Sequence, residues 1–354
     1  MAKNEPGAHN PLMTMSQTSP LLSPEEIAVR AGQQVPHLHF PNRAELFAER
    51  ETRLRQLAIG HTMRDFLLFT AELVRAQHHV LQSWPSVPLP DAAAIDAASQ
   101  AGQPPLPAAH WPRDPAWRTQ FRRMLDALLP RLEGSPAQAS VRGVRALDDE
   151  TLERQADRLL QNIMFGLDMA AAPLIAAGLQ TYWTHMVLAT LEARGDDRLA
   201  PFGRVEEATL CPCCGSRPTA SVSRIDPSAG GYRYLHCSLC AMQWHMVRIK
   251  CSHCESTKGI HYQSLQPADA ATGSPQKQAV EAETCEECNH YLKIVRMDRD
   301  NYVEPVADDL ASLTLDLLVS DAGFQRHGVN LMLLFGDPDT TDNPESLPGD
   351  GGGG

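Results

Sequence analysis

Four Cys-x-x-Cys pairs in one stretch of the chain constrain its fold more than any other feature. Two residues between cysteines let a tight turn direct both sulfurs to one point, which supplies half of a tetrahedral site with four thiolate ligands. Four such halves predict two metal sites. The predicted metal ligands are Cys211, Cys214, Cys237, Cys240, Cys251, Cys254, Cys285 and Cys288.

The residues between the pairs indicate which halves combine. Two strand-like runs, PTASVSRI and YRYLH, lie between the first and second pairs and predict a hairpin that returns the second pair to the first. The runs GIHYQSL and AVEAET predict another hairpin between the third and fourth pairs. We therefore expect one site from the first two pairs and one from the last two, although spacing alone permits other combinations.

The link between these hairpins, MQWHMVRIK, predicts a further strand-like run shared by both modules. We expect Trp244 in this run to pack over a metal site and limit the access of solvent. The ninth cysteine, Cys213, could be an alternative ligand, a reactive thiol or a bystander, and we favour the bystander. His236, His245 and His253 flank cysteines and could replace a ligand, but four thiolates per site make that replacement unnecessary.

Charge and hydropathy argue against several classes of protein. The formal net charge of −12 argues against a nucleic-acid surface, where a basic stripe would be expected. The longest apolar run, MAAAPLIAAGL, is interrupted by proline and is far shorter than the roughly 20 residues of a membrane span. The N-terminal residues contain no apolar region of a secretory signal. We therefore expect a cytoplasmic protein without membrane insertion, in which reduced Cys-x-x-Cys pairs bind metal.

The residues before the cysteine stretch predict an α-helical domain over 23–200, after a disordered segment over 1–22. Ser23, followed by proline and two glutamates, is the first helix-capping pattern, and Asn42 begins a second one. The segment from Ser83 to Ala116 is rich in proline and alanine and predicts a connection with at most one short helix.

Apolar periodicity predicts roughly five to seven helices in this domain, including 62–82, 148–165 and 172–194. Gln77, Gln180, His78 and His79 are more simply explained as surface or hydrogen-bonded core residues than as ligands. No pattern in the helical domain predicts catalysis.

The remaining residues complete an α+β fold. Two tandem rubredoxin-like or zinc-ribbon modules are predicted over 205–250 and 247–303. Residues 304–336 predict a C-terminal helix that packs back on the protein, and 337–354 predict a disordered tail. The predicted class is thus an N-terminal α-helical bundle, two tandem modules and a C-terminal helix.

The ligand type limits the chemistry of the predicted sites. Four thiolates hold either zinc or a single iron, and ligand type does not choose between them. Zinc would be structural, whereas iron could take part in one-electron exchange. Because four sulfurs leave no open coordination position, we expect no enzymatic activity.

Several segments resemble one known family. The runs CPCCGSRP, RYLHCSLCAMQWHMVRIKCSHC, CEECNHYLKIV and ADDLASLTLDLL closely resemble the formate dehydrogenase accessory protein FdhE family, and AAPLIAAGLQTYW in the helical domain resembles it more weakly. The resemblance implies a cytoplasmic assembly factor that contacts the catalytic subunit of formate dehydrogenase before export. It also implies that the eight paired cysteines hold iron in two tetrathiolate sites, with zinc as the alternative.

Two other functions remain open from the sequence. A rubredoxin-like electron carrier would also use iron, but two modules attached to a large helical domain exceed what a carrier needs. A nucleic-acid-binding zinc ribbon fits the cysteine spacing and conflicts with the acidic charge. The sequence leaves the oligomeric state, the partner-binding face and the active redox state open.

Overall fold

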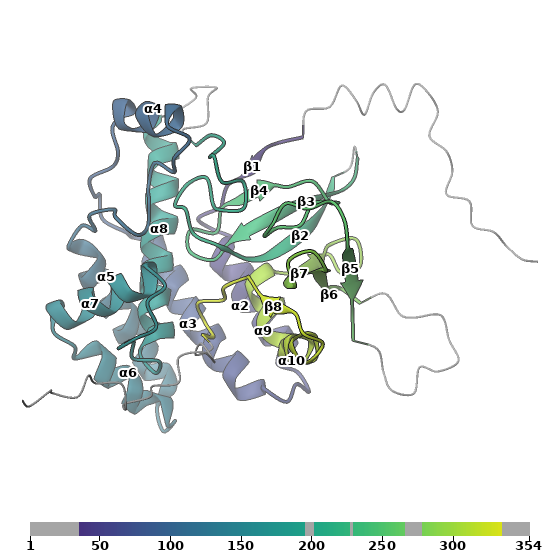
Figure 1. Cartoon of the computed structure of the whole chain (residues 1–354). Coiled ribbons are helices and arrows are strands. Elements are labelled where there is room, and N and C mark those ends of the chain that lie inside the picture. The colour runs from purple at the N-terminus through teal and green to yellow at the C-terminus, as the bar shows by residue number, and fades with distance from the viewer. Residues whose placement is uncertain (1–34, 195–201, 227–228, 266–277, 335–354) are drawn as a thin grey trace, which may run out of the picture. The chain divides into compact units, whose positions relative to one another are not determined.

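Most of the helices precede most strands of one mixed β-sheet along the chain, which agrees with the predicted α+β class (Figure 1). The computed structural model describes residues 35–194, 202–226, 229–265 and 278–334. The capping pattern at Ser23 and both terminal segments predicted to be disordered lie outside these residues. The described residues from Pro36 onward form one compact unit.

Seven α-helices and a short 3-10 helix make up the described N-terminal part. The helices expected over 62–82 and 172–194, and the short helix within the proline-rich connection, are confirmed within two residues. Their bounds are α2 (Leu46–Leu57), α3 (Arg64–Gln82), α4 (Ala92–Gln100), α5 (Ala116–Leu128), η1 (Leu129–Leu132), α6 (Ala137–Arg145), α7 (Asp149–Leu160) and α8 (Ala172–Arg194).

Two details of the helical part differ from the prediction. The helix expected to continue to Phe165 ends at Leu160, because Asn162 adopts a left-handed conformation (φ 56°). The amide of Ile163 then donates to the carbonyl of Arg158 at 2.8 Å, a Schellman-type end that the sequence pattern did not reveal. Helix α6 was not predicted, because it is short and contains Gly143 in its interior.

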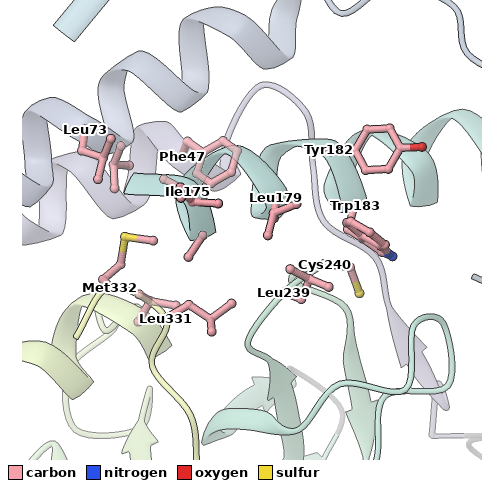
Figure 2. Close-up of a cluster of buried hydrophobic side chains, with 14 of the residues drawn as sticks. Phe47, Leu73, Ile175, Leu179, Tyr182, Trp183, Leu239, Cys240, Leu331 and Met332 are labelled. Atoms are coloured by element: carbon pink, nitrogen blue, oxygen red, sulfur yellow. The ribbon is translucent and has the colours of Figure 1, made fainter. Parts of the chain in front are cut away.

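Helix α8 lies at the centre of the buried core. Most of its side chains are buried around the whole helix, so it contacts neighbours on every side. Figure 2 shows Leu179 and Trp183 of α8 facing Leu239 and Cys240 of the cysteine stretch. One continuous cluster of buried residues therefore includes the helices and the first half of the cysteine stretch.

Eight strands form one sheet in the order β1-β4-β3-β2-β7-β6-β5, with β8 paired to β7. The two predicted hairpins are present: β2 pairs with β3, and β6 pairs with β5 and β7, all antiparallel. The strands are β1 (Leu38–His39), β2 (Pro218–Asp226), β3 (Ala229–Cys237), β4 (Gln243–His245), β5 (Ile260–Gln263), β6 (Val280–Cys285), β7 (His290–Arg296) and β8 (Gln325–Arg326).

The connection between the modules corrects one expectation. The link MQWHMVRIK contributes only β4, which pairs with β3 and β1 and does not reach the second hairpin. The modules are instead joined by the parallel pairing of β2 with β7, where Val222 lies opposite Val295. A buried ion pair crosses the same boundary, since Arg233 Nη2 lies 2.8 Å from Glu283 Oε1.

The C-terminal helix is divided into α9 (Pro305–Ala311) and α10 (Leu313–Asp321). The break at Ser312 has a local cause, because two helix carbonyls accept hydrogen bonds from side chains. Ser312 Oγ donates to the carbonyl of Asp308 at 2.7 Å, and Lys293 Nζ donates to that of Asp309 at 2.6 Å. No helix in the described chain combines the length and apolar composition that a bilayer span requires.

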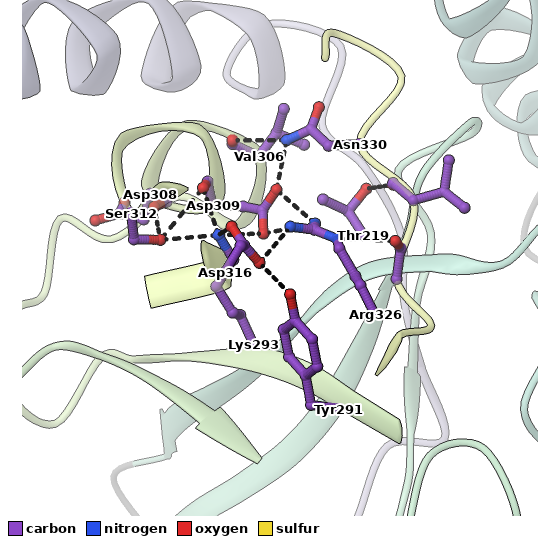
Figure 3. Close-up of polar contacts among 12 residues, drawn as sticks. Thr219, Tyr291, Lys293, Val306, Asp308, Asp309, Ser312, Asp316, Arg326 and Asn330 are labelled. Carbon is purple, nitrogen blue, oxygen red and sulfur yellow. Dashed lines mark hydrogen bonds and ion pairs between the residues drawn. The ribbon is translucent and has the colours of Figure 1, made fainter. Parts of the chain in front are cut away.

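A buried network of charges holds these helices against the sheet (Figure 3). Lys293 of β7 is fully buried and pairs with Asp309 and Asp316, and Arg326 pairs with the same two carboxylates. Burial opposes ionisation of Asp309, but Arg326 and Lys293 hold its pKa below the usual range. Two cations thus balance two buried anions, and Tyr291 Oη adds a hydrogen bond to Asp316.

We expect Lys293→Met to lower the free energy of unfolding by about 3 kcal/mol, because it leaves two buried carboxylates with one cation. Urea unfolding monitored by circular dichroism measures the change. The matched control is Arg145→Met, which removes an exposed pair with Asp126 and should lower the free energy of unfolding far less, because solvent screens that pair. Equal losses in the two variants would contradict this account of the network.

Candidate metal centres

The four Cys-x-x-Cys turns share one feature of the backbone conformation. The residue after each second cysteine has a positive φ: 73° at Gly215, 59° at Ala241, 61° at Glu255 and 55° at Asn289. In three of the four turns, the amide of this left-handed residue donates a hydrogen bond to the carbonyl of the turn's first cysteine, at 2.8 Å for Gly215. The left-handed residue closes the turn and places both sulfurs on one side. Glycine and asparagine are the residue types that commonly adopt this conformation, so a sequence indicates it only where one of them follows the second cysteine.

The first cysteine set consists of Cys211, Cys214, Cys237 and Cys240, the combination that the first hairpin predicted. Its sulfurs lie within 4.8 Å of one another, with 3.5 Å between Cys211 and Cys240 and between Cys214 and Cys237. A tetrahedral ion with metal–sulfur bonds of about 2.3 Å separates its ligand sulfurs by about 3.8 Å. The donor set therefore fits zinc or iron after small adjustments.

The charge of the first cysteine set also favours a cation. All four thiols are buried, and burial raises the pKa values of Cys237 and Cys240 well above the usual range. The pKa of Cys211 shifts in the other direction: burial opposes its ionisation, but hydrogen bonds from neighbouring thiols hold its pKa well below the usual value. Four thiolates cannot coexist here without a compensating positive charge, which a bound metal ion supplies.

The helical part holds the first cysteine set by side-chain hydrogen bonds. Gln180 Nε2 of α8 donates to the carbonyl of Ser238, between two of the cysteines, at 2.7 Å. Gln77 Nε2 of α3 donates to Gln180 Oε1 at 3.3 Å and to the carbonyl of Ala177 at 2.9 Å. Both glutamines are buried, so the expectation of hydrogen-bonded core residues holds, and their contact with the cysteine turn is a further finding.

The proline-rich connection between α3 and α5 covers the other side of this set. The amides of Leu106 and Ala108 donate to the carbonyls of Cys213 and Cys214 at 3.0 and 2.9 Å. Trp183 Nε1 of α8 fixes the connection by donating to the carbonyl of Leu106 at 3.2 Å. Nothing in the composition of the connection predicted this role.

The second cysteine set consists of Cys251, Cys254, Cys285 and Cys288, as the second hairpin predicted. The sulfurs of Cys251 and Cys288 lie 3.9 Å apart, and those of Cys254 and Cys285 lie 3.7 Å apart. This set is open to solvent, because Cys254 is exposed and Cys288 is half-buried. Burial raises the pKa of Cys251 to about 11.

The other sequence candidates lie outside the two sets. Cys213 is fully buried in the core, and burial raises its pKa well above the usual value. Trp244 is buried in the same cluster as the first cysteine set, and its Nε1 donates to the carbonyl of Ala208 at 2.9 Å. His236 is buried, with its pKa lowered to about 3 by burial, and His245 packs edge-on against Tyr234.

His253 is the flanking histidine that does join a group of potential ligands. Together with Cys288 and His290 it offers ligand atoms that lie within 4.8 Å of one another. Sequence reasoning missed His290, although it follows the last cysteine by two residues.

A cleft of about 1000 Å³ opens beside the first cysteine set. Its walls include Cys211 and Cys214, the proline-rich connection near Pro104, and the end of α7 at Gln161. Gln161 also borders a smaller cavity that includes Phe165, which is 77% exposed. The helical part and the first module thus share a hollow surface with an exposed aromatic side chain nearby.

We expect Gly215→Ala to lower the free energy of unfolding by about 1 kcal/mol, because a side chain is strained at φ 73° and its Cβ would lie 3.3 Å from Pro104. Chemical unfolding of both proteins measures the effect. In the control Gly143→Ala the new Cβ meets no atom within 4 Å in a helix, so stability should rise by about 0.5–1 kcal/mol. A stability gain in both variants would refute the strain at Gly215.

Comparisons with known proteins agree with the geometry. Family descriptions match three successive regions: FdhE, N-terminal, over residues 35–200; FdhE, central domain, over 210–248; and FdhE, C-terminal domain, over 249–333. The chain is 38% identical over 309 residues to the "Protein FdhE homolog" of Cronobacter sakazakii and to the "Protein FdhE" of Salmonella dublin, covering 87% of this chain and 94% of each relative.

A solved structure is also similar. The crystal structure of the FdhE protein from Pseudomonas aeruginosa matches with a TM-score of 0.70 and 38% identity, covering 84% of this chain and 99% of that one. Sequence and fold agree over the helical part and both cysteine sets. The chain therefore belongs to the FdhE family.

Proposed function

We propose that this protein is a cytoplasmic accessory factor for formate dehydrogenase, which binds the catalytic subunit before export. The observation that carries the proposal is the pair of four-cysteine sets within a chain that matches FdhE along most of its length. Four sulfurs in each set leave no open position for a substrate, so the protein acts by binding and not as an enzyme.

We further propose that each set holds one metal ion, with all eight cysteines as ligands. Iron is the proposed metal because of the family resemblance, and zinc is the alternative because the same ligands accept both. Bound iron supplies one-electron exchange, whereas zinc supplies folding energy only. The protein's own residues exclude water from the first ion, through Trp183, Leu239 and the proline-rich connection.

The cleft beside the first cysteine set is the proposed docking surface for the catalytic subunit. Its size and its position between two parts of the fold suit a protruding partner segment. Three glutamates, Glu206, Glu207 and Glu255, line the cleft against one arginine, Arg217, so its net negative charge favours a segment with basic residues. Exposed Phe165 next to the cleft supplies an apolar anchor for such a segment.

One observation favours a second candidate function. Solvent reaches Cys254 and, in part, Cys288 of the second cysteine set, and an electron carrier of the rubredoxin type would require such access. A carrier would exchange electrons with soluble redox partners in the absence of formate dehydrogenase, and an accessory factor would not need to do so.

The first test of this proposal is metal content. Protein purified without oxygen should hold about two metal ions per chain, and Cys→Ser at Cys285 should remove about one of them. Elemental analysis measures the number and identity of the ions, and a visible thiolate-to-ferric band on oxidation identifies iron. A matched control, Ser252→Ala, alters another turn of the same cysteine set without removing a ligand and should keep both ions. A single ion shared by both sets would contradict the two-site arrangement.

The second test concerns the partner. The protein should co-purify with the catalytic subunit of formate dehydrogenase, and Phe165→Ala should weaken that binding by about tenfold or more. Ile59→Ala removes an equally exposed apolar side chain elsewhere and should leave the affinity unchanged. Binding curves measure the affinity of each variant for the catalytic subunit. If Phe165→Ala and Ile59→Ala bind with equal affinity, docking at the cleft is refuted. If the unmodified protein does not bind the subunit, the catalytic subunit is refuted as the partner.

A further inference from the structure

The two cysteine sets differ in how a metal ion could reach them. Every cysteine of the first set is buried, and the helices and the proline-rich connection cover it. The second set exposes Cys254 and, in part, Cys288. Two histidines lie beside the exposed edge of the second set, and neither is needed to complete it.

These histidines face Cys288 closely. A ligand atom of His253, one of His290 and the sulfur of Cys288 all lie within 4.8 Å of one another. The two imidazole rings stack with centroids 3.9 Å apart and planes 11° from parallel. Imidazole nitrogen and thiolate sulfur together bind divalent zinc, cobalt and iron.

One hydrogen bond prepares His290 as a ligand. Its Nδ1 lies 2.6 Å from the carbonyl oxygen of Cys288, and a carbonyl oxygen only accepts hydrogen bonds. Nδ1 therefore carries the proton, and Nε2 keeps its lone pair free for a metal ion. Metal-binding histidines are commonly oriented in this way by a second hydrogen bond.

The other histidine can move to complete the group. A tetrahedral ion separates its nitrogen and sulfur ligands by roughly 3.3–3.8 Å, so the group must contract slightly on binding. His253 is exposed and its ring can turn toward Cys288. The ring of buried His327 meets that of His253 edge-on, with centroids 5.2 Å apart, and is itself held by Ser252, so it restricts the rotation of the His253 ring.

We propose that His253, His290 and Cys288 form a capture site through which a divalent transition-metal ion enters and leaves the second cysteine set. The inference rests on the proposed metal binding by both sets. On capture, two imidazole nitrogens and the Cys288 sulfur would replace all but one of the water ligands of the hydrated ion, which becomes four-coordinate, and the thiol proton of Cys288 would pass to solvent. The sulfurs of Cys251, Cys254 and Cys285 then displace both nitrogens and the remaining water, releasing their protons.

The first cysteine set lacks such an entrance among the described residues. The histidine closest to it in sequence, His236, is buried, and its Nδ1 is engaged by Gln243 at 3.3 Å. No described histidine joins the ligand atoms of that set. The ion in the second set should therefore exchange faster than the ion in the first.

The experiment uses the full chain loaded with Co²⁺ in both sets, whose thiolate absorption reports each bound ion. Transfer to a chromogenic chelator should show one fast and one slow equivalent, and Cys254→Ser should remove the fast one. The double variant His253→Phe/His290→Phe keeps flat rings and removes the nitrogens. We expect it to bind both ions and to slow the fast phase by about tenfold or more.

The matched control is His261→Phe, which changes an exposed histidine on β5 that pairs with Glu286. Its fast phase should match that of the unmodified protein. Unchanged exchange in the double variant, or equal rates for the two sets in the unmodified protein, overturns the capture site and leaves the proposed metal binding intact. A chain that takes up no Co²⁺ overturns both.

Discussion

The burial of four thiols in the helical core is the constraint on which the rest of the structure depends. Burial raises the pKa values of Cys237 and Cys240, so the first cysteine set cannot carry four negative charges without a cation. The same sulfurs belong to the apolar cluster built around α8. The same cysteines therefore take part in core packing and require a compensating cation. The helical part and the first module consequently depend on one another for stability.

The second module depends on the first through the sheet and through charged side chains. Parallel pairing of β2 with β7 joins the hairpins, and the buried pair of Arg233 and Glu283 crosses the same boundary. Lys293 extends the connection to the C-terminal helices. These contacts hold one edge of the module, while the edge near Cys254 is open to solvent.

The two cysteine sets differ in their exposure to solvent, although each consists of two Cys-x-x-Cys pairs. Both use the same Cys-x-x-Cys turn closed by a left-handed residue, so the local geometry is repeated four times. The surroundings differ: hydrogen bonds from Gln180 and the proline-rich connection enclose the first set, and His253 and His290 flank the second. Under the proposed function, the first ion would stabilise the core beside the docking cleft, and the second would be the exchangeable one.

The sequence by itself determined the α+β class, most helices, both hairpins and the grouping of the eight cysteines, because these depend on local periodicity and spacing. Tertiary structure alone decided the parallel pairing of β2 with β7, the cover over the first cysteine set and the ion network around Lys293. It also placed His290 beside His253. These features join residues that are far apart in the chain. Burial and charge pairing stabilise them, and a local sequence pattern contains no information on either.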